Sequence, residues 1–238
     1  MNIKIGIVAH DDRTEDADVL AEAVDANVYS RDNGDLGCEV NHRRVWSTLA
    51  SYDSDWSVVL EDDAQPVEGF RAQLESALAV APTPVVSLYL GKGRPEFAQT
   101  HIRTIARALS PETQAAPCWL TGQVLLHAVG VAIRTFLIPN MLDHLTQPPA
   151  VFLAQDQAIE HWANASGHRI GYTWPSLVNH ADTPSVIEEH PDGVPRGPRI
   201  VDGAIVVTPR RGWRVGTREH WSSDEVELTL RRPRHVHP

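Results

Sequence analysis

Short apolar runs that end in polar turns alternate with amphipathic stretches along most of this 238-residue chain. Residues 3–9, Ile-Lys-Ile-Gly-Ile-Val-Ala, predict a first buried strand, and the apolar positions between 19 and 24 predict a helix after it. A second short strand is expected at residues 27–29. Because strand, helix and strand follow in this order, the pattern predicts a βαβ layout with a parallel sheet, and the expected fold class is α/β.

The same pattern divides the rest of the chain. Further strands are expected over residues 56–60, 84–90, 128–134 and 169–173, and further helices over residues 36–52, from Pro66, over 136–145 and from 154. Residues 30–35 read as a polar loop, and residues 95–117 read as irregular with a weak helical patch at 101–109. Pro and Gly become frequent from residue 191, which predicts a main domain over 1–190 and a linker with an Arg-rich, β-containing extension over 191–238.

The most informative stretch is the apolar strand over residues 56–60, which runs directly into Glu61, Asp62 and Asp63. Three adjacent carboxylates at the end of a buried strand cost free energy unless a cation, hydrogen-bond donors or solvent compensates them. A divalent metal explains them, because hard cations take oxygen ligands from clustered carboxylates. The alternative is that the acids are solvated and that Asp62 or Asp63 caps a helix that begins near Pro66.

Other polar residues are expected at the same edge of the sheet. Ligands of parallel α/β sheets bind at the carboxyl ends of strands, and residues 10–13 follow the first strand there. His42 falls on the inward stripe of the predicted helix 36–52, where a core role and a ligand-binding role are both open. Asp156 lies near a predicted helix start, where it is either an N-cap or a functional carboxylate.

Charge and composition narrow the function classes. The formal net charge is −10, with 12 Lys and Arg against 25 Asp and Glu in residues 1–190, and 9 against 6 in residues 191–238. The acidic body argues against non-specific nucleic-acid binding, whereas the basic end can contact an anionic partner. Two cysteines, no signal peptide and no apolar stretch long enough to span a bilayer make a cytoplasmic protein without a membrane span the expectation.

Four segments of the chain occur in an order that is typical of one enzyme family. They are Gly37-Cys38-Glu39-Val40-Asn41-His42 with Trp46, then Val58-Val59-Leu60-Glu61-Asp62-Asp63-Ala64, the Gly-containing strand before Arg134, and Pro175-Ser176-Leu177-Val178 with Ser185-Val186-Ile187. This order resembles glycosyltransferase family 25, the lipopolysaccharide and collagen galactosyltransferase group, over about residues 34–187. The chain departs from the family pattern at Asn41, where the family usually has Ser.

The resemblance implies a GT-A-like αβα sandwich with a mostly parallel central sheet. It also implies that Glu61 and Asp63 hold Mn²⁺ or Mg²⁺ on a nucleotide-diphosphate sugar, most simply a UDP-sugar. His180 matches a late histidine on the metal side of GT-A enzymes, and a solvated loop histidine is the alternative. The remaining cofactor-binding candidates around the nucleotide are Arg13, Arg31, Asp35, His42 and Asp62.

Family members invert the configuration at the anomeric carbon, which requires one general base. The resemblance therefore predicts a metal-dependent inverting hexosyltransferase with Asp156 as that base and a glycan as acceptor. A hydroxymethylated pyrimidine in phage-type DNA is a second candidate acceptor. Two other functions stay open: a metal-dependent phosphoesterase or nuclease that uses the same carboxylates, and a non-catalytic nucleotide-sugar-binding module.

Overall fold

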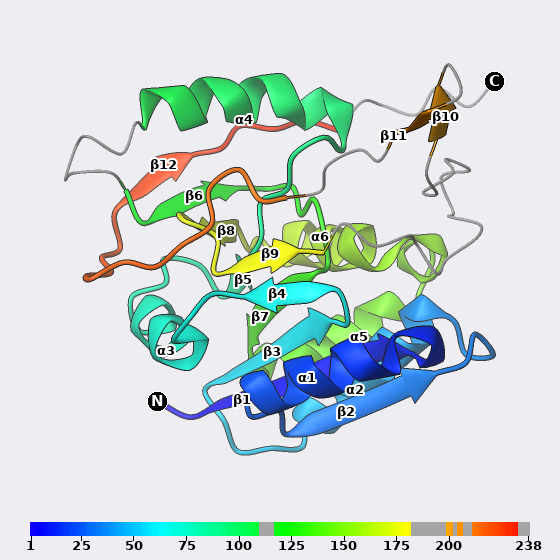
Figure 1. Cartoon of the computed structure of the whole chain (residues 1–238). Coiled ribbons are helices and arrows are strands. Elements are labelled where there is room, and N and C mark those ends of the chain that lie inside the picture. The colour runs from blue at the N-terminus through cyan, green and yellow to red at the C-terminus, as the bar shows by residue number, and fades with distance from the viewer. Residues whose placement is uncertain (110–116, 182–198, 202–203, 207–210, 233–238) are drawn as a thin grey trace.

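The computed structural model describes residues 1–109, 117–181, 199–201, 204–206 and 211–232. Its centre is an eight-stranded sheet (Figure 1). Across the sheet, the strands are β12 (Glu225–Glu227), β6 (Trp119–Gly122), β8 (Ile170–Thr173), β5 (Val85–Ser87), β7 (Gly130–Arg134), β3 (Trp56–Glu61), β1 (Ile3–His10) and β2 (Val28–Asp32). Four of the seven pairings between neighbouring strands are parallel. The predicted α/β class with a mostly parallel sheet is confirmed.

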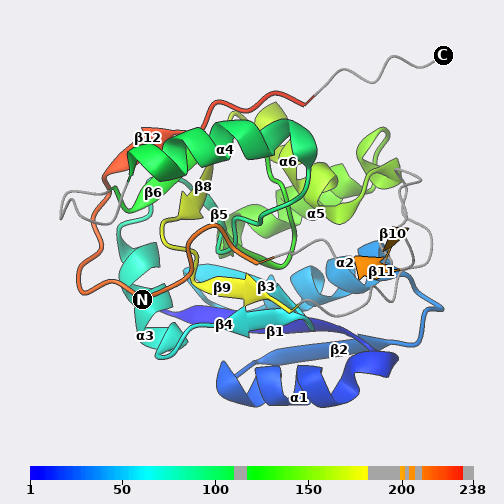
Figure 2. The same ribbon diagram turned by 45° about the horizontal axis from the view of Figure 1, so that its top comes forward.

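Helices cover both faces of this sheet, which makes an αβα sandwich consistent with a GT-A-like fold (Figure 2). One buried cluster takes residues from α2 (Cys38–Leu49), α4 (Glu96–Ala108), α5 (Ile138–Leu145) and α6 (Gln155–Ala165). The other takes residues from α1 (Thr14–Ala23) and α3 (Phe70–Ala79). Short 3₁₀ turns over Asp11–Arg13, Thr135–Leu137 and Ala150–Phe152 lead into three of the helices.

The alternation of side chains along β1 explains how one strand serves both layers. Ile3, Ile5 and Ile7 pack in the cluster with α1 and α3, whereas Val8 belongs to the opposite cluster. Gly6 lets α2 approach the sheet, because a Cβ atom at this position would lie 2.4 Å from Cγ1 of Val45. The α2–sheet contact therefore depends on the absence of a side chain at residue 6.

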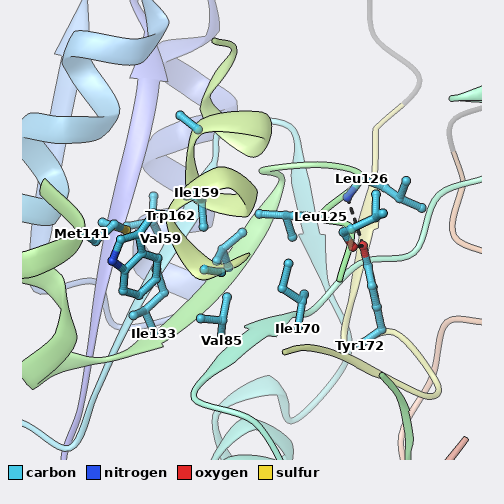
Figure 3. Close-up of a cluster of buried hydrophobic side chains, with 14 of the residues drawn as sticks. Val59, Val85, Leu125, Leu126, Ile133, Met141, Ile159, Trp162, Ile170 and Tyr172 are labelled. Carbon is cyan, nitrogen blue, oxygen red and sulfur yellow. Dashed lines mark hydrogen bonds between the residues drawn. The ribbon is translucent and has the colours of Figure 1, made fainter. Parts of the chain in front are cut away.

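The core on the α5 and α6 face is continuous from helix to sheet. Figure 3 shows Met141 and Trp162 beside Val59 and Ile133, which come from neighbouring strands of the sheet. Trp162 is fully buried, and its indole N–H donates to Asn140. Burial of an aromatic side chain of this size contributes a large share of core stability. This packing fixes the start of α6 relative to the sheet, which matters for Asp156.

A small second sheet forms next to the acidic strand end. β4 (Ala64–Pro66) pairs antiparallel with β9 (Val178–His180), so Pro66 lies in a strand and the prediction of a helix from Pro66 is wrong. Helix α3 begins only at Phe70, after Gly69 has taken a left-handed φ of 65°. The alternative in which Asp62 or Asp63 caps that helix is therefore also wrong. Pairing with a segment more than a hundred residues away decides this conformation, and local sequence does not reveal it.

Three further elements differ from the sequence pattern. β2 continues to Asp32, so part of the predicted loop is strand. Residues 96–108 form a regular helix, whereas the sequence predicted only a weak helical patch over residues 101–109. A stripe with Ala98 and Ile102 is enough to dock this helix. Only residues 85–87 of the predicted strand 84–90 are strand.

The C-terminal segment also adds to the fold. β12 pairs in parallel with β6 at the edge of the central sheet, and β10 (Arg199–Val201) pairs with β11 (Ala204–Val206). Ser185–Ile187, part of the family resemblance, lie outside the described residues. Among the helices of the described segments, none combines the length and the hydrophobicity that a membrane span requires.

Candidate active site

The carboxyl ends of three neighbouring strands meet at one edge of the sheet. In the register of β1 with β2, His10 lies opposite Asp32, and in the register of β1 with β3, Val8 lies opposite Glu61. The backbone N–H of His10 donates to Oδ2 of Asp62 over 2.8 Å. The sequence-predicted edge of residues 10–13 and the acidic strand end are therefore in direct contact.

Arg13 joins the two aspartates of this strand end. Its Nη1 donates to Oδ1 of Asp62 and to Oδ2 of Asp63, each over 2.8 Å. All three side chains are at most 10% exposed, so this is a buried ion-pair network. Burial alone lowers the pKa of Arg13, but the charges of Asp63 and Asp62 outweigh it and raise the pKa. Arg13 therefore lies at the acidic strand end, where it binds the two aspartates.

His180 approaches Asp63 from β9. Its Nε2 lies 3.3 Å from Oδ2 of Asp63, and it is 7% exposed, so the alternative of a solvated loop histidine is wrong. The strand pairing that places Ala64 opposite His180 brings the two side chains together. Oδ1 of Asp63 is buried and has no hydrogen-bond partner among the described residues. Burial raises the pKa of the Asp63 carboxyl group, with smaller contributions from the charges of Glu61 and Asp62.

Glu61 contacts α2 through His42. Its Oε1 lies 3.1 Å from Nε2 of His42, which is 1% exposed. Burial alone raises the pKa of Glu61, but the hydrogen bond and charge of His42 outweigh it and lower the pKa. The thiol of Cys38, one helical turn before His42, completes a group of three potential ligands. Burial and the charge of Glu61 raise the pKa of this thiol well above its usual value.

Asp156 lies in the first turn of α6, whose N-cap is Ala154, so the N-cap interpretation of Asp156 is wrong. Its Oδ1 does accept a hydrogen bond from the N–H of Gln157 over 2.8 Å. Burial raises the pKa of Asp156 to about 7, although the charge of Arg232 opposes this. The charge of Glu61 also raises the pKa of Asp156, so the carboxyl groups of Asp156 and Glu61 lie within electrostatic range of one another.

The two weaker nucleotide candidates lie on and after β2. Arg31 is exposed, and its Nη1 donates to Oγ1 of Thr14 over 3.5 Å. Asp35 is exposed in the following turn, where its Oδ2 accepts from the amide of Asn33. Both belong to the strand-end edge of β2, and neither contacts the acidic strand end through a hydrogen bond identified in the described chain.

The sequence patterns gave no role to several residues that complete the site. Asp32 is 7% exposed and accepts from the N–H groups of Leu36 and Gly37, which holds the turn into α2. Arg232 binds Glu160 through Nε and Nη2 and extends toward Asp156. Glu160 gives no sequence signal for a partner 72 positions later.

A second missed group lies behind His180. The centroid of the Tyr89 ring lies 5.9 Å from that of His180 and 5.1 Å from that of His127, and both pairs of rings are tilted. Burial and the charge of His180 lower the pKa of His127 to about 3, so its imidazole is neutral at physiological pH. Tyr89 therefore packs against both imidazole rings, including that of His180.

Comparison with known proteins adds little to this geometry. No family model matches the sequence, and no match is found among curated proteins. The crystal structure of A197 from STIV has a TM-score of 0.38 and 13% identity, over 80% of this chain and 92% of that chain. A glycosyltransferase involved in the glycosylation of the major capsid of PBCV-1 has a TM-score of 0.32 and 9% identity, over 65% of this chain and 72% of that chain. Both TM-scores are low, so the functional argument rests on the site itself.

Proposed function

We propose that this chain is a metal-dependent inverting glycosyltransferase that moves a sugar from a nucleotide-diphosphate sugar to a hydroxyl group. The observation that carries the proposal is Asp156, a carboxyl group in the first turn of α6 whose pKa is raised to about 7 by burial, with a contribution from the charge of Glu61. A general base works best when its pKa is close to the working pH. Asp156 meets that condition, and it lies within electrostatic range of Glu61 at the ligand-binding edge of the sheet.

The pair of Asp63 and His180 supports a divalent cation at this edge. Nδ1 of His180 lies within hydrogen-bond distance of the carbonyl oxygen of Ala181, which can only accept, so Nδ1 carries a proton. Nε2 then either carries a second proton or presents a lone pair to Oδ2 of Asp63. The second arrangement, with a further unpartnered oxygen on Asp63, fits Mn²⁺ or Mg²⁺. A cation bound there neutralises the charge that develops on a nucleoside diphosphate leaving group.

In this proposal, different residues have different roles in the transfer reaction. The acceptor oxygen attacks the anomeric carbon, Asp156 takes the proton of the acceptor hydroxyl, and the bond to the diphosphate breaks on the opposite face. The product is a glycoside of inverted configuration, with the nucleoside diphosphate as leaving group. Arg13 holds Asp62 and Asp63 in position through its two hydrogen bonds.

The donor and the first acceptor of this proposal come from the resemblance to glycosyltransferase family 25. We assign a UDP-sugar as donor and place its nucleotide near Arg31, Asp35, His42 and Asp62, which lie on or next to neighbouring strand ends. A glycan is the first acceptor to test, because the acidic residues 1–190 repel a polyanion. DNA that carries hydroxymethylated pyrimidines is the second, through the basic residues of the C-terminal segment.

A thermal-shift screen tests the proposal directly. The full chain is heated with UDP- and GDP-sugars, with and without Mn²⁺, and sugar release is then followed over hours. We expect one nucleotide sugar to raise the melting temperature only with the metal, and slow hydrolysis of that sugar to follow. Asp156→Asn retains the shift and loses the hydrolysis.

Three other outcomes separate the alternatives. A metal-dependent shift with no hydrolysis or transfer identifies a nucleotide-sugar-binding module. Cleavage of a simple phosphodiester, without any response to sugar nucleotides, identifies a phosphoesterase or nuclease. If no nucleotide sugar stabilises the chain with any divalent metal, the proposed function is wrong.

A further inference from the structure

Three different ligand types converge where α2 meets the end of β3. Cys38 opens α2, His42 follows one helical turn later on the same face, and Glu61 ends β3. One ligand atom of each of these residues lies within 4.8 Å of the other two. The group is separate from the Asp63–His180 pair, because Glu61 contacts His42 and Asp63 contacts His180.

The surroundings of this group leave ligand capacity unused. His42 is 1% exposed, and its Nδ1 is buried with no hydrogen-bond partner among the described residues. Cys38 is a free cysteine, as is Cys118, so no disulfide uses its sulfur.

The distances fit a tetrahedral metal after a small adjustment. With bonds of about 2.3 Å to sulfur and about 2.0–2.1 Å to nitrogen or oxygen, ligand atoms on a tetrahedral Zn²⁺ lie about 3.4–3.6 Å apart. Nε2 of His42 and Oε1 of Glu61 are already 3.1 Å apart. The sulfur of Cys38 lies within 4.8 Å of a ligand atom of each of the other two residues, so a small shift would bring it into the same range.

The chemical types of the three ligand atoms favour zinc. A thiolate, an imidazole and a carboxylate are the ligand set of Zn²⁺, whereas Mn²⁺ and Mg²⁺ favour oxygen ligands. We propose that Cys38, His42 and Glu61 form a second metal site that binds Zn²⁺, next to but distinct from the site at Asp63 and His180. Three protein ligands leave a fourth position open, as in zinc sites that keep an exchangeable ligand. The proposal does not depend on the glycosyltransferase assignment.

Cobalt titration of the metal-free full chain tests this site. Co²⁺ occupies zinc sites and gives a sulfur-to-metal charge-transfer absorption only when a thiolate is a ligand. We expect one Co²⁺ per chain with this absorption, and its loss when Zn²⁺ is added, because Zn²⁺ binds such sites more tightly. Cys38→Ala removes the absorption. His42→Asn weakens Co²⁺ binding by more than about tenfold, since even loss of an outer-shell partner costs that much.

Cys118 provides the matched control. It lies at the start of the β6 region, and its sulfur contacts Ser222, outside the proposed site. Cys118→Ala should keep the absorption and the stoichiometry. To separate loss of the metal from loss of the fold, Zn²⁺ should raise the melting temperature of the wild-type chain and of Cys118→Ala, and leave that of Cys38→Ala unchanged.

The result that overturns the proposal is a wild-type chain without charge-transfer absorption, or an absorption that survives Cys38→Ala. Asp63→Asn distinguishes the two metal sites. It should keep the cobalt absorption while it loses the Mn²⁺-dependent response to nucleotide sugars. Failure of the zinc proposal therefore leaves the proposed function standing, and the reverse also holds.

Discussion

Arg13 donates a hydrogen bond to Oδ2 of Asp63 over 2.8 Å, although the two residues are 50 positions apart in the sequence. Parallel pairing of β1 with β3 brings them together, because both follow the carboxyl ends of neighbouring strands. The guanidinium group also binds Asp62, so one buried cation compensates two carboxylates. The acidic strand end thus folds stably through a cation that the chain itself supplies.

Replacement of Arg13 should therefore destabilise the fold strongly. Arg13→Met leaves Asp62 and Asp63 buried without their cation, and loss of one partner of a buried ion pair costs about 3–5 kcal/mol. Urea unfolding monitored by circular dichroism measures the change. Arg44→Met on the exposed side of α2 is the control and should change stability by less than about 0.5 kcal/mol. Equal stability of the two variants would contradict the buried network.

Asp63 should decide the metal response. Asp63→Asn removes the charged oxygen that faces His180, so we expect Mn²⁺ to stop enhancing nucleotide-sugar binding, with affinity for the metal down by more than about a hundredfold. Calorimetric titration of Mn²⁺ in the presence of the nucleotide measures this. Asp53→Asn, at an exposed position before β3, should bind as the wild type does. Unchanged Mn²⁺ affinity in Asp63→Asn would exclude this carboxylate as a ligand.

The pH profile of transfer should report Asp156. The proposed base must be ionised, and its pKa is about 7, so turnover should rise with pH through about 7 and then level off. Asp156→Asn should lower turnover by about 10²–10⁴ while the Michaelis constant for the donor changes little. Initial rates between pH 5 and 9 supply the test. A residual rate near that of the wild type would remove Asp156 from the base role.

The same residue should limit the stability of the fold above neutral pH. The folded-state pKa of Asp156 is about 7, above its ordinary value of 3.8, so the folded state binds the proton more tightly than the unfolded state does. Its contribution to stability is fully present below the unfolded pKa and is lost as pH rises through about 7. Asp156→Asn should therefore be more stable than the wild type at pH 8, on the order of a few kcal/mol, with a difference that shrinks toward pH 4. Denaturant unfolding at several pH values measures the difference, and a constant gap would contradict the raised pKa.

Gly122 should hold the C-terminal segment against the sheet. A Cβ atom at this position would lie 2.4 Å from the carbonyl oxygen of Leu228, which is backbone and cannot move aside easily. Gly122→Ala should cost about 1–3 kcal/mol, as overpacking of a close contact does, and should increase proteolysis within residues 224–232. Gly216→Ala is the control, because its nearest neighbour is Pro175 at 3.9 Å. Limited proteolysis followed by mass spectrometry compares the two variants.

Much of this fold could be predicted from local sequence, because the hydrophobic and charge patterns were strong and short-range. The run of isoleucines at residues 3, 5 and 7 fills one cluster, and its period of two could only be a strand with a buried face. The acidic strand end was visible because carboxylates directly after an apolar strand conflict with burial. Helix α4 was predicted only as a weak patch over residues 101–109, because few of its residues are fully buried.

For the candidate site, the sequence predicted less and the tertiary structure decided more. The sequence nominated Glu61, Asp63, His180 and Asp156 by residue type and by resemblance, but not their partners. Asp63 pairs with His180 only because β4 adds to β9, and Glu61 turns to His42 because α2 packs on β3. These contacts join residues 19 to over 100 positions apart, and no periodicity encodes such separations.

The sequence by itself determined that this chain is an α/β protein with an acidic strand end, because hydrophobic period and charge are local properties. Only the tertiary structure decided what compensates each acid. In the folded chain Arg13 forms ion pairs with Asp62 and Asp63, and His42 contacts Glu61. The tertiary structure also raised the pKa of Asp156 to about 7 through burial. Burial and strand pairing depend on the whole chain at once, and they set the protonation and ligand capacity on which the proposed chemistry depends.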